Sequence, residues 1–510
     1  MTLLKPNSLA ALLLSTAVPA LADVTLPALF SDHMVMQADV NAPVWGWADA
    51  GEEVTVSLAG HQATARTGAD GRWRTNLPPM KSRAEPLTLT VEGKNKLVIQ
   101  DVLIGEVWLA SGQSNMAFQF SRGQYAQAET EAAALPQVRM FTVKAQSTRA
   151  PQERCEGAWV VATPETVGAF SAVAWFFGKE LHGRLGAPVG MINSSWGGTD
   201  IAAWTSEEAQ AGVPALKEAM EAWKARAAAF DAAKAEAAHE KRLAAWKEAV
   251  RKAKAEGRPA PRGPRKEAHP DVSQNRPANL FNGMISPLIP YALRGAIWYQ
   301  GEHNCATVEK ASLYATQLPL LIQDWRARWD KELAFAWVQL PNFEQTAPRP
   351  LVREAMLKSL SVPNTGMAVT IDAGEANDNH PKDKKTVGGR LALWALAKVY
   401  GADVPAWSGP LPAGHEVRGG EVVLGFEHTT GGLAARGGEL RGFMIAGTDK
   451  VWKPGTARIE GGKVVVSSAE VAAPVAVRYS WASNPDGNLF NGAGLPASPF
   501  RTDDWEITVP

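Results

Sequence analysis

Four short polar segments carry residue types that serve acyl transfer: a serine, a Gly-Gly turn, a glutamine, and a histidine beside an acid. These residues are Ser114, Gly198, Gln300, His380 and Asp378. A serine hydroxyl becomes a nucleophile when an imidazole takes its proton, and a carboxylate can orient that imidazole. The oxyanion that develops needs hydrogen-bond donors, which backbone N–H groups and side-chain amides supply. The sequence therefore predicts nucleophilic acyl transfer.

The chemistry of each residue type assigns it a role in such a reaction. Ser114 is predicted to be the nucleophile, and His380 the general base that later acts as the general acid. Gly112 permits the tight turn that presents Ser114. The N–H groups of Ser114 and Gly198, together with the side-chain amide of Gln300, are predicted to form the oxyanion hole.

The carboxylate that orients the histidine is the least determined member of this set. Asp378 is the predicted residue, Asp372 and Glu375 are alternatives, and a Ser–His pair without an acid is a further one. A serine after a strand is also often a helix N-cap, so only the coincidence of four segments favours catalysis. Ser114 does not lie in a G-x-S-x-G motif, because residue 116 is Met, and this excludes the α/β-hydrolase elbow.

The elements that position these residues are predicted to be parallel strands, because each polar segment follows an apolar run. Strands covered on both faces read as continuous apolar runs, and helical patterns between them indicate an α/β sheet. Ligands of such sheets bind beyond the carboxyl ends of the strands. The predicted strands are 102–110, 189–193, 296–299, 334–340 and 367–371, and the predicted helices are 168–185, 310–330, 352–360 and 386–400.

The remaining segments differ from this α/β pattern. Short alternating runs between turns predict a β-sandwich-like domain at residues 23–100 and a second β-domain at 406–510. An Ala-, Lys- and Glu-rich segment at 205–269 has helical spacing of its apolar residues and predicts a helical insert. The catalytic domain is then divided into residues 101–204 and 270–405.

The first 22 residues are typical of a secretory signal peptide. Lys5 precedes the apolar segment Leu9–Ala20, and Ala20-Leu21-Ala22 provides the small-x-small cleavage pattern. The chain is therefore predicted to be exported, periplasmic or secreted, with a mature start near Asp23. The apolar segment is too short to span a bilayer, and no later segment is predicted to do so.

Composition excludes several other classes of protein. The 52 basic and 52 acidic residues cancel, so no nucleic acid partner is expected. The sequence has no Walker loop and no metal-ligand motif, so neither a cofactor nor a metal is predicted. Two cysteines exclude a disulfide scaffold, although Cys155 and Cys305 could pair after export. The 19 tryptophans, against 6 tyrosines, fit a core role or stacking against sugar rings.

The segments that contain Ser114, Gln300 and His380 resemble sequence blocks of the sialate O-acetylesterase family of SGNH hydrolases. Ile104–Met116 is similar to the nucleophile block, and Trp298–Glu302 is similar to the third block. Asn379-His380-Pro381, followed by the Lys384–Gly388 helix, looks like the histidine block, although the D-x-x-H aspartate is Asn377 here. The resemblance covers essentially the whole mature chain. It implies a flavodoxin-like catalytic domain, flanking β-domains, no cofactor, and hydrolysis of O-acetyl esters on sugars.

The resemblance also points to a substrate, an acetylated carbohydrate and most specifically O-acetylated sialic acid. Acetylxylan or another polysaccharide is an alternative within the enzymes, and a catalytically silent sugar-binding protein is an alternative of another class. Oligomeric state stays open. The candidate substrate-binding residues are Glu302, His303 (where the family commonly has Ser), Trp196 and Arg276, with Arg353, Arg390 and Trp204 as further candidates.

Overall fold

The catalytic part of the chain is built on a twisted sheet whose central strand is β7 (Lys96–Gly112). The structure is a computed structural model that describes residues 23–507, so the predicted signal segment lies outside the described residues and export stays a prediction. The strand order is β13-β12-β11-β7-β10-β8-β9. The other strands of this path are β8 (Leu135–Thr142), β9 (Trp159–Ala162), β10 (Val189–Ser195), β11 (Gly295–Tyr299), β12 (Ala334–Val338) and β13 (Thr365–Ala368).

The predicted parallel sheet is mixed in the structure. Every neighbouring pair from β13 to β8 is parallel, but β9 pairs antiparallel with β8 at the edge. The five predicted strands are present, with ends that differ by a few residues, whereas β8 and β9 have no counterpart in the prediction. The carboxyl ends of β7, β10 and β11 lie side by side and are followed by Ser114, Gly198 and Gln300, whereas Asp378 and His380 follow β13.

β7 belongs to two sheets and crosses the predicted boundary between residues 100 and 101. Its first half pairs with β6 (Arg83–Glu92) and its second half with β10 and β11. A bulge separates the halves at Asp101, whose φ is +55°. Arg139 donates two hydrogen bonds to the Asp101 carboxylate, at 2.7 and 3.0 Å. Asp101 therefore ties the bulge to β8, and the chain has no linker at this point.

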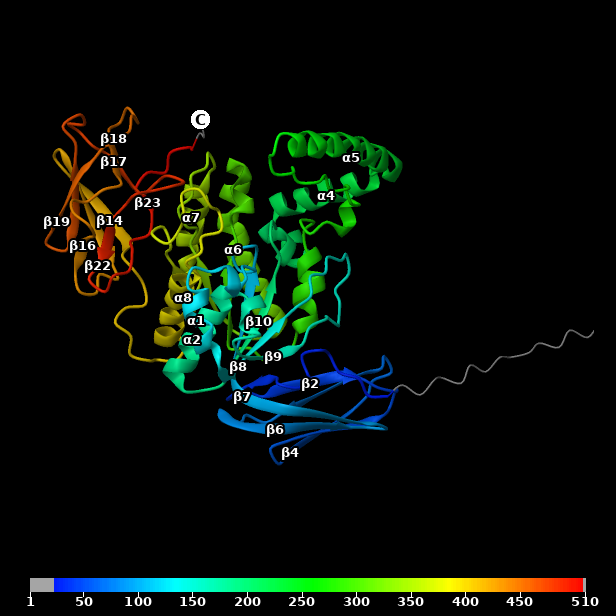
Figure 1. The fold of residues 1–510 in the computed structure, drawn as a ribbon. Coiled ribbons are helices and arrows are strands. Elements are labelled where there is room, and N and C mark those ends of the chain that lie inside the picture. Colours follow the sequence, from blue (N-terminus) through cyan, green and yellow to red (C-terminus); the bar gives the residue numbers. More distant parts are fainter. Residues whose placement is uncertain (1–22, 508–510) are drawn as a thin grey trace, which may run out of the picture.

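Helices cover both faces of the catalytic sheet (Figure 1). Trp108 of β7 packs edge-on against Phe177 of α2 (Ala172–Leu185), while Trp298 of β11 packs against Trp325 of α6 (Val308–Trp329) on the opposite face. α8 (Lys384–Lys398) lies against α2, and α7 (Arg349–Lys358) lies against α6. A Cβ on Gly388 of α8 would lie 2.7 Å from that of Phe176, so this close helix contact requires glycine.

β-structure flanks the sheet at both ends of the described chain. The N-terminal part contains the pair β2 (Ala42–Trp47) and β5 (Arg72–Leu77), as well as β3 (Glu53–Leu58) and β4 (His61–Arg66), which pair with each other. The C-terminal part, with strands from β14 (Leu411–Arg418) to β23 (Phe500–Arg501), has a hydrophobic core of its own. The domain limits themselves stay a prediction.

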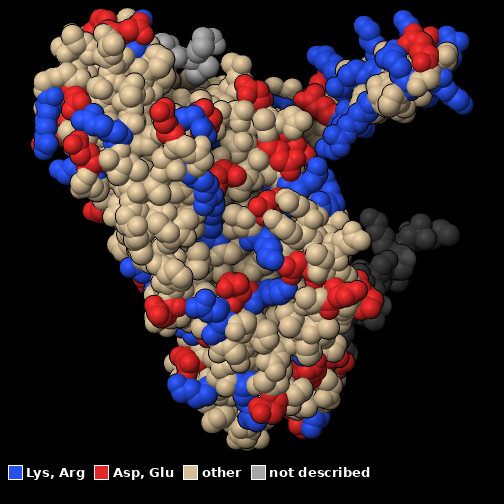
Figure 2. Space-filling model, turned by 60° about the vertical axis from the view of Figure 1, so that its left-hand side comes forward, with Lys and Arg blue, Asp and Glu red and all other residues tan. Residues whose placement is uncertain are grey.

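The predicted insert contains helices that project from the body, α4 (Pro214–Ala228) and α5 (Ala232–Ala255) (Figure 1). Lys and Arg side chains gather on this projection, whereas basic and acidic side chains are mixed over the body (Figure 2). Between residues 23 and 507, no helix combines the length and the apolar character needed to cross a bilayer.

Candidate active site

Gly112 brings three strand ends together at the site. Its φ is +137°, and a Cβ there would lie 2.1 Å from the carbonyl oxygen of Tyr299, so only glycine fits at the end of β7. The carbonyl of Gly112 accepts a hydrogen bond from the N–H of Trp196, at 3.0 Å. The next N–H, that of Gln113, donates to Tyr299 at 2.9 Å. The turn that carries Ser114 is therefore fixed to the ends of both neighbouring strands.

The predicted nucleophile and base are in contact. Nε2 of His380 lies 2.8 Å from Oγ of Ser114, although 266 positions separate the two residues in the chain. Both residues are half-buried. This distance lies within the range needed for proton transfer between a hydroxyl and an imidazole. The pair can therefore generate a serine nucleophile.

Of the three candidate acids, only Asp378 contacts the histidine. Its Oδ1 accepts the backbone N–H of His380 at 2.8 Å and lies 3.8 Å from Nδ1, which is too long for a hydrogen bond. Asp372 instead accepts both Nη atoms of Arg390, at 2.6 and 2.8 Å. Glu375 accepts the backbone N–H of residue 382 at 2.8 Å. Asp378 is thus the acid placed to fix the His380 loop.

The Gly-Gly turn after β10 lies against the Ser114 side chain. A Cβ on Gly197 would lie 3.1 Å from the Cβ of Ser114, which puts the Gly-Gly turn directly against the serine. Gly198 has a φ of +70° and is exposed. Within residues 23–507, the N–H groups of Ser114 and Gly198 have no hydrogen-bond partner. Free N–H groups beside a nucleophile are the donors that an oxyanion requires.

The predicted oxyanion role of Gln300 is corrected by its hydrogen bonds. Its side chain is fully buried, and its amide nitrogen donates to the carbonyl of Thr199 at 2.8 Å and to Oδ1 of Asn304 at 2.7 Å. An amide nitrogen has two hydrogens, so neither remains for an oxyanion. Its Oε1 accepts from the Tyr314 hydroxyl at 3.0 Å. Gln300 therefore fixes the Gly-Gly loop and the loop after β11.

Comparison with known proteins identifies the family. The family model described as "Carbohydrate esterase, sialic acid-specific acetylesterase" matches residues 104–258 and 275–396. Human sialate O-acetylesterase is 30% identical over 428 residues, which cover 75% of this chain and 72% of the human protein. The chain belongs to this carbohydrate esterase family. The match includes Ser114, His380 and every other residue of the candidate site described above.

Further relatives extend the similarity to nearly the whole chain. Rat sialate O-acetylesterase is 28% identical over 534 residues, covering 92% of both proteins. The crystal structure of a carbohydrate acetylesterase from Xanthomonas citri is 37% identical, with a TM-score of 0.81 over 95% of this chain and 100% of that one. The flanking β-structure and the helical projection of this esterase therefore lie within the compared region.

Three of the four predicted substrate-binding residues lie near the catalytic pair. Glu302 accepts a hydrogen bond from the side chain of Asn115, and its second carboxylate oxygen is buried without a partner in the described chain. His303 is half-exposed, with Nε2 4.0 Å from Asp200. Trp196 is half-buried and directly precedes the Gly-Gly turn. These side chains border the site, and their role toward a sugar stays a prediction.

Two of the arginine candidates, Arg276 and Arg353, and Trp204 are corrected by their burial, whereas Arg390 is half-buried and bound to Asp372. Arg276 is 3% exposed and donates to Asn279 at 3.1 Å, and Trp204 is fully buried against Trp298. Arg353 is also fully buried and donates to four backbone carbonyls. These side chains serve the fold, because their polar groups are turned toward protein atoms. The positive charge of the two arginines gave no sign of this burial in the sequence.

A buried polar cluster beneath the catalytic pair was not recognised as functional in the sequence. Asn115 donates to the carbonyl of Asn379 at 3.0 Å, and its Oδ1 accepts from Nζ of Lys384 at 2.5 Å. Arg349, 1% exposed, donates to the side chain of Asn379. Since Asn115 follows Ser114 and Asn379 precedes His380, this cluster links the two loops that carry the catalytic pair. A lysine at a helix start usually reads as a solvated charge.

Lys384 has a perturbed pKa. Burial lowers the pKa of its ammonium from 10.5 to about 7, against the opposing attraction of Glu302 and other carboxylates. The ammonium lies 4.9 Å from the ring centre of Phe118 and 5.1 Å from that of Tyr299. A cation at this position costs folding free energy because water is excluded from it.

Lys384→Met is expected to change how stability depends on pH. The unfolded lysine holds its proton up to its ordinary pKa of 10.5, whereas the folded one releases it above about 7. Between these values the unfolded state binds more protons, so the free energy of unfolding rises with pH by up to about 1.4 kcal/mol per unit. In thermal melts, the Tm of the wild type relative to the variant should rise from about pH 7 to about pH 9. A constant Tm difference would contradict this.

The two cysteines do not form a disulfide, which answers the question the sequence left open. Both are free thiols, Cys155 half-buried and Cys305 buried. Burial raises the pKa of Cys155 to about 11 and that of Cys305 to about 12, so both thiols stay protonated at neutral pH. In the described part of the chain, no group of three His, Cys, Asp or Glu side chains is placed to hold a metal ion.

Proposed function

We propose that this esterase hydrolyses O-acetyl esters of sialic acids through an acetyl-serine intermediate. The observation that carries the proposal is the 2.8 Å contact between Ser114 and His380, beside the free N–H groups of Ser114 and Gly198. Membership in a family described as sialic acid-specific acetylesterases supports the substrate class. We further propose that the catalytic part has the flavodoxin-like SGNH hydrolase fold, because each of the three matching sequence blocks reaches beyond the carboxyl end of a strand of one sheet.

In the first half of the reaction, His380 takes the hydroxyl proton while Oγ of Ser114 attacks the acetyl carbonyl carbon. The carbonyl oxygen becomes an oxyanion that accepts hydrogen bonds from the N–H groups of Ser114 and Gly198. The ester C–O bond then breaks, and the protonated His380 gives its proton to the departing sugar oxygen. The products of this half are the free sugar hydroxyl and acetyl-Ser114.

In the second half, water replaces the sugar. His380 takes a proton from the water, whose oxygen attacks the acetyl carbon, and the same N–H groups bind the second oxyanion. The bond to Oγ of Ser114 breaks as His380 returns the proton to that oxygen, and acetic acid leaves and ionises to acetate. Purified protein is expected to release acetate from O-acetylated sialic acid. Release no faster than in the absence of protein would overturn the proposal.

Asp378→Asn tests the proposed orienting acid. We expect kcat to fall by at least about ten-fold, because the neutral amide lacks the negative charge with which the Asp378 carboxylate stabilises the imidazolium that forms on His380. Asp372→Asn and Glu375→Gln are the matched controls, since these acids bind Arg390 and a backbone N–H instead. All three variants are assayed with p-nitrophenyl acetate at saturation. Small and equal effects would instead favour a Ser–His pair.

An acetylated polysaccharide is the second candidate substrate. The observation that favours it is Trp196, half-exposed beside the Gly-Gly turn, where an indole face can pack against a sugar ring. A silent sugar-binding protein is disfavoured, because the contact between Ser114 and His380 has no use in binding alone.

A further inference from the structure

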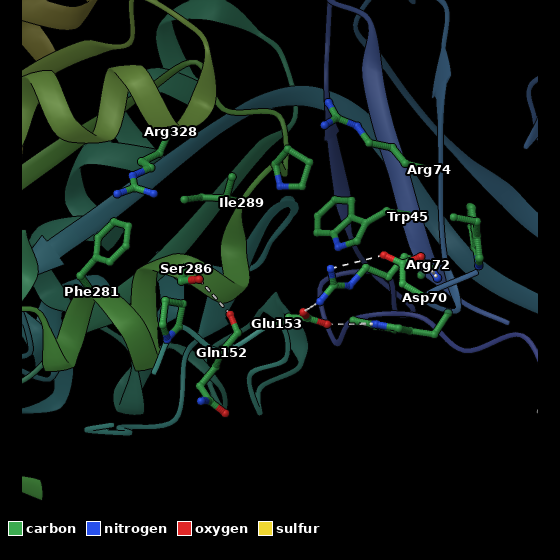
Figure 3. A pocket seen from close by; sticks show the side chains of 15 residues that line it. Trp45, Asp70, Arg72, Arg74, Gln152, Glu153, Phe281, Ser286, Ile289 and Arg328 are labelled. Atoms are coloured by element: carbon green, nitrogen blue, oxygen red, sulfur yellow. Dashed lines mark hydrogen bonds and ion pairs between the residues drawn. The ribbon is translucent and has the colours of Figure 1, made fainter. Parts of the chain in front are cut away.

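A cavity of about 500 Å³ lies between the N-terminal β-structure and the catalytic part (Figure 3). One wall comes from β2 and β5, and the other from the segment before β11 and the end of α6. This volume falls in the range of small-molecule sites. The residues that line it include Trp45, Arg72, Arg74, Phe281, Ile289 and Arg328.

This cavity is separate from the candidate active site. Ile289 precedes the amino end of β11, whereas Gln300 and Gly301 follow its carboxyl end. β7 and β11 are parallel, with Gly295 opposite Trp108 and Tyr299 opposite Gly112. Ser114 therefore lies at the carboxyl ends of the strands, and the cavity lies at their amino ends. A ligand in the cavity would not occupy the catalytic centre.

The apolar surfaces of the cavity face each other across the gap. Trp45 stands on one wall, and Phe281 and Ile289 on the other (Figure 3). Trp45 is half-buried and is held by Phe30, 4.8 Å between ring centres, and by Tyr291, 6.3 Å away. A fixed indole with an exposed part offers contact area to the C–H face of a sugar ring at little entropic cost.

Among the described arginines that line the cavity, Arg74 is the one whose side chain has no acidic partner. Arg72 is paired with Asp70 and Glu153, and Arg328 is paired with Glu208 at 2.7 Å. Arg74 is exposed and extends beside Trp45 in Figure 3, and its side chain has no ion pair or hydrogen bond within residues 23–507. A free guanidinium binds a carboxylate through two parallel hydrogen bonds.

We propose that this cavity is a second carbohydrate-binding site, which takes a sugar that carries a carboxylate. Arg74 binds the carboxylate, and Trp45 packs against the sugar ring. The class of sugar rests on the proposed function, since a sialylated glycan offers both groups. Such a site would hold the esterase on a glycan while Ser114 acts on another residue of the same material.

The test is the binding of sialyllactose, which has no acetyl ester, to the full chain by saturation-transfer NMR titration. Arg74→Gln is expected to weaken binding at the cavity by about ten-fold, because the charge-assisted pair is lost. Arg74→Lys should restore part of it. Arg66→Gln is the matched control, an exposed arginine on β4 that does not line the cavity. Lactose, which lacks the carboxylate, should bind the variants and wild type alike.

The outcomes separate this proposal from the proposed function. Equal sialyllactose titrations for Arg74→Gln and Arg66→Gln would overturn the second site, whatever the esterase activity. A protein that binds sialyllactose through Arg74 but leaves acetylated sialic acid intact would retain the site and refute the function. Hydrolysis of p-nitrophenyl acetate should be unchanged in both arginine variants, because neither residue is near Ser114.

Discussion

Replacing Ser114 by alanine is expected to lower kcat for ester hydrolysis by about 10⁴-fold or more, to the level that binding and the oxyanion donors alone provide. The variant loses the hydroxyl that contacts Nε2 of His380, so no acetyl-enzyme can form. The fold should be unaffected, because Ser114 is half-buried on a turn and alanine can adopt the same backbone conformation there. Initial rates with p-nitrophenyl acetate and a thermal melt measure both effects.

Ser195→Ala is the matched control for this loss. Ser195 also ends a strand of the sheet, but its hydroxyl donates to Asn193 at 2.7 Å and does not contact His380. We expect it to keep most of the activity. A Ser114→Ala protein with more than about a tenth of wild-type turnover would exclude the acetyl-serine mechanism.

Replacing His380 by alanine is expected to have nearly the same effect as replacing Ser114. The two side chains act as one unit, so the Ser114→Ala, His380→Ala double variant should be no slower than either single variant. His303→Ala is the matched control, because this second histidine of the region faces Asp200 instead of the serine. Losses that multiply in the double variant would indicate that the two residues act independently.

The strands could be predicted where apolar residues run without interruption, and not elsewhere. Strands β10 and β11 are fully apolar or small through most of their length and were expected within a few residues. β8 was missed because Pro136 and Arg139 break its apolar pattern, and the burial of Arg139 depends on Asp101 and on backbone carbonyls that it reaches in the fold. β7 was cut short because its half-exposed beginning belongs to another sheet.

The catalytic pair could be predicted because Ser114 and His380 each lie in a polar segment after an apolar run, and both segments resemble blocks of one esterase family. The donors of the oxyanion hole could be predicted only in part. The hydrogen bonds of the Gln300 amide depend on the positions of Thr199 and Asn304 in the fold, which the sequence does not show. Burial of an arginine is likewise a tertiary property. Arg276 looked available for a substrate, yet it is enclosed by its own neighbours.

We propose that this active site prefers acetylated sialic acid to acetylated xylan. The measurement that tests it most directly is acetate release from O-acetylated sialic acid and from acetylated xylan at matched ester concentration. We expect a higher kcat/KM for the sialic acid ester, with Ser114→Ala inactive on both substrates. A higher kcat/KM for xylan or its oligomers would contradict the substrate assignment.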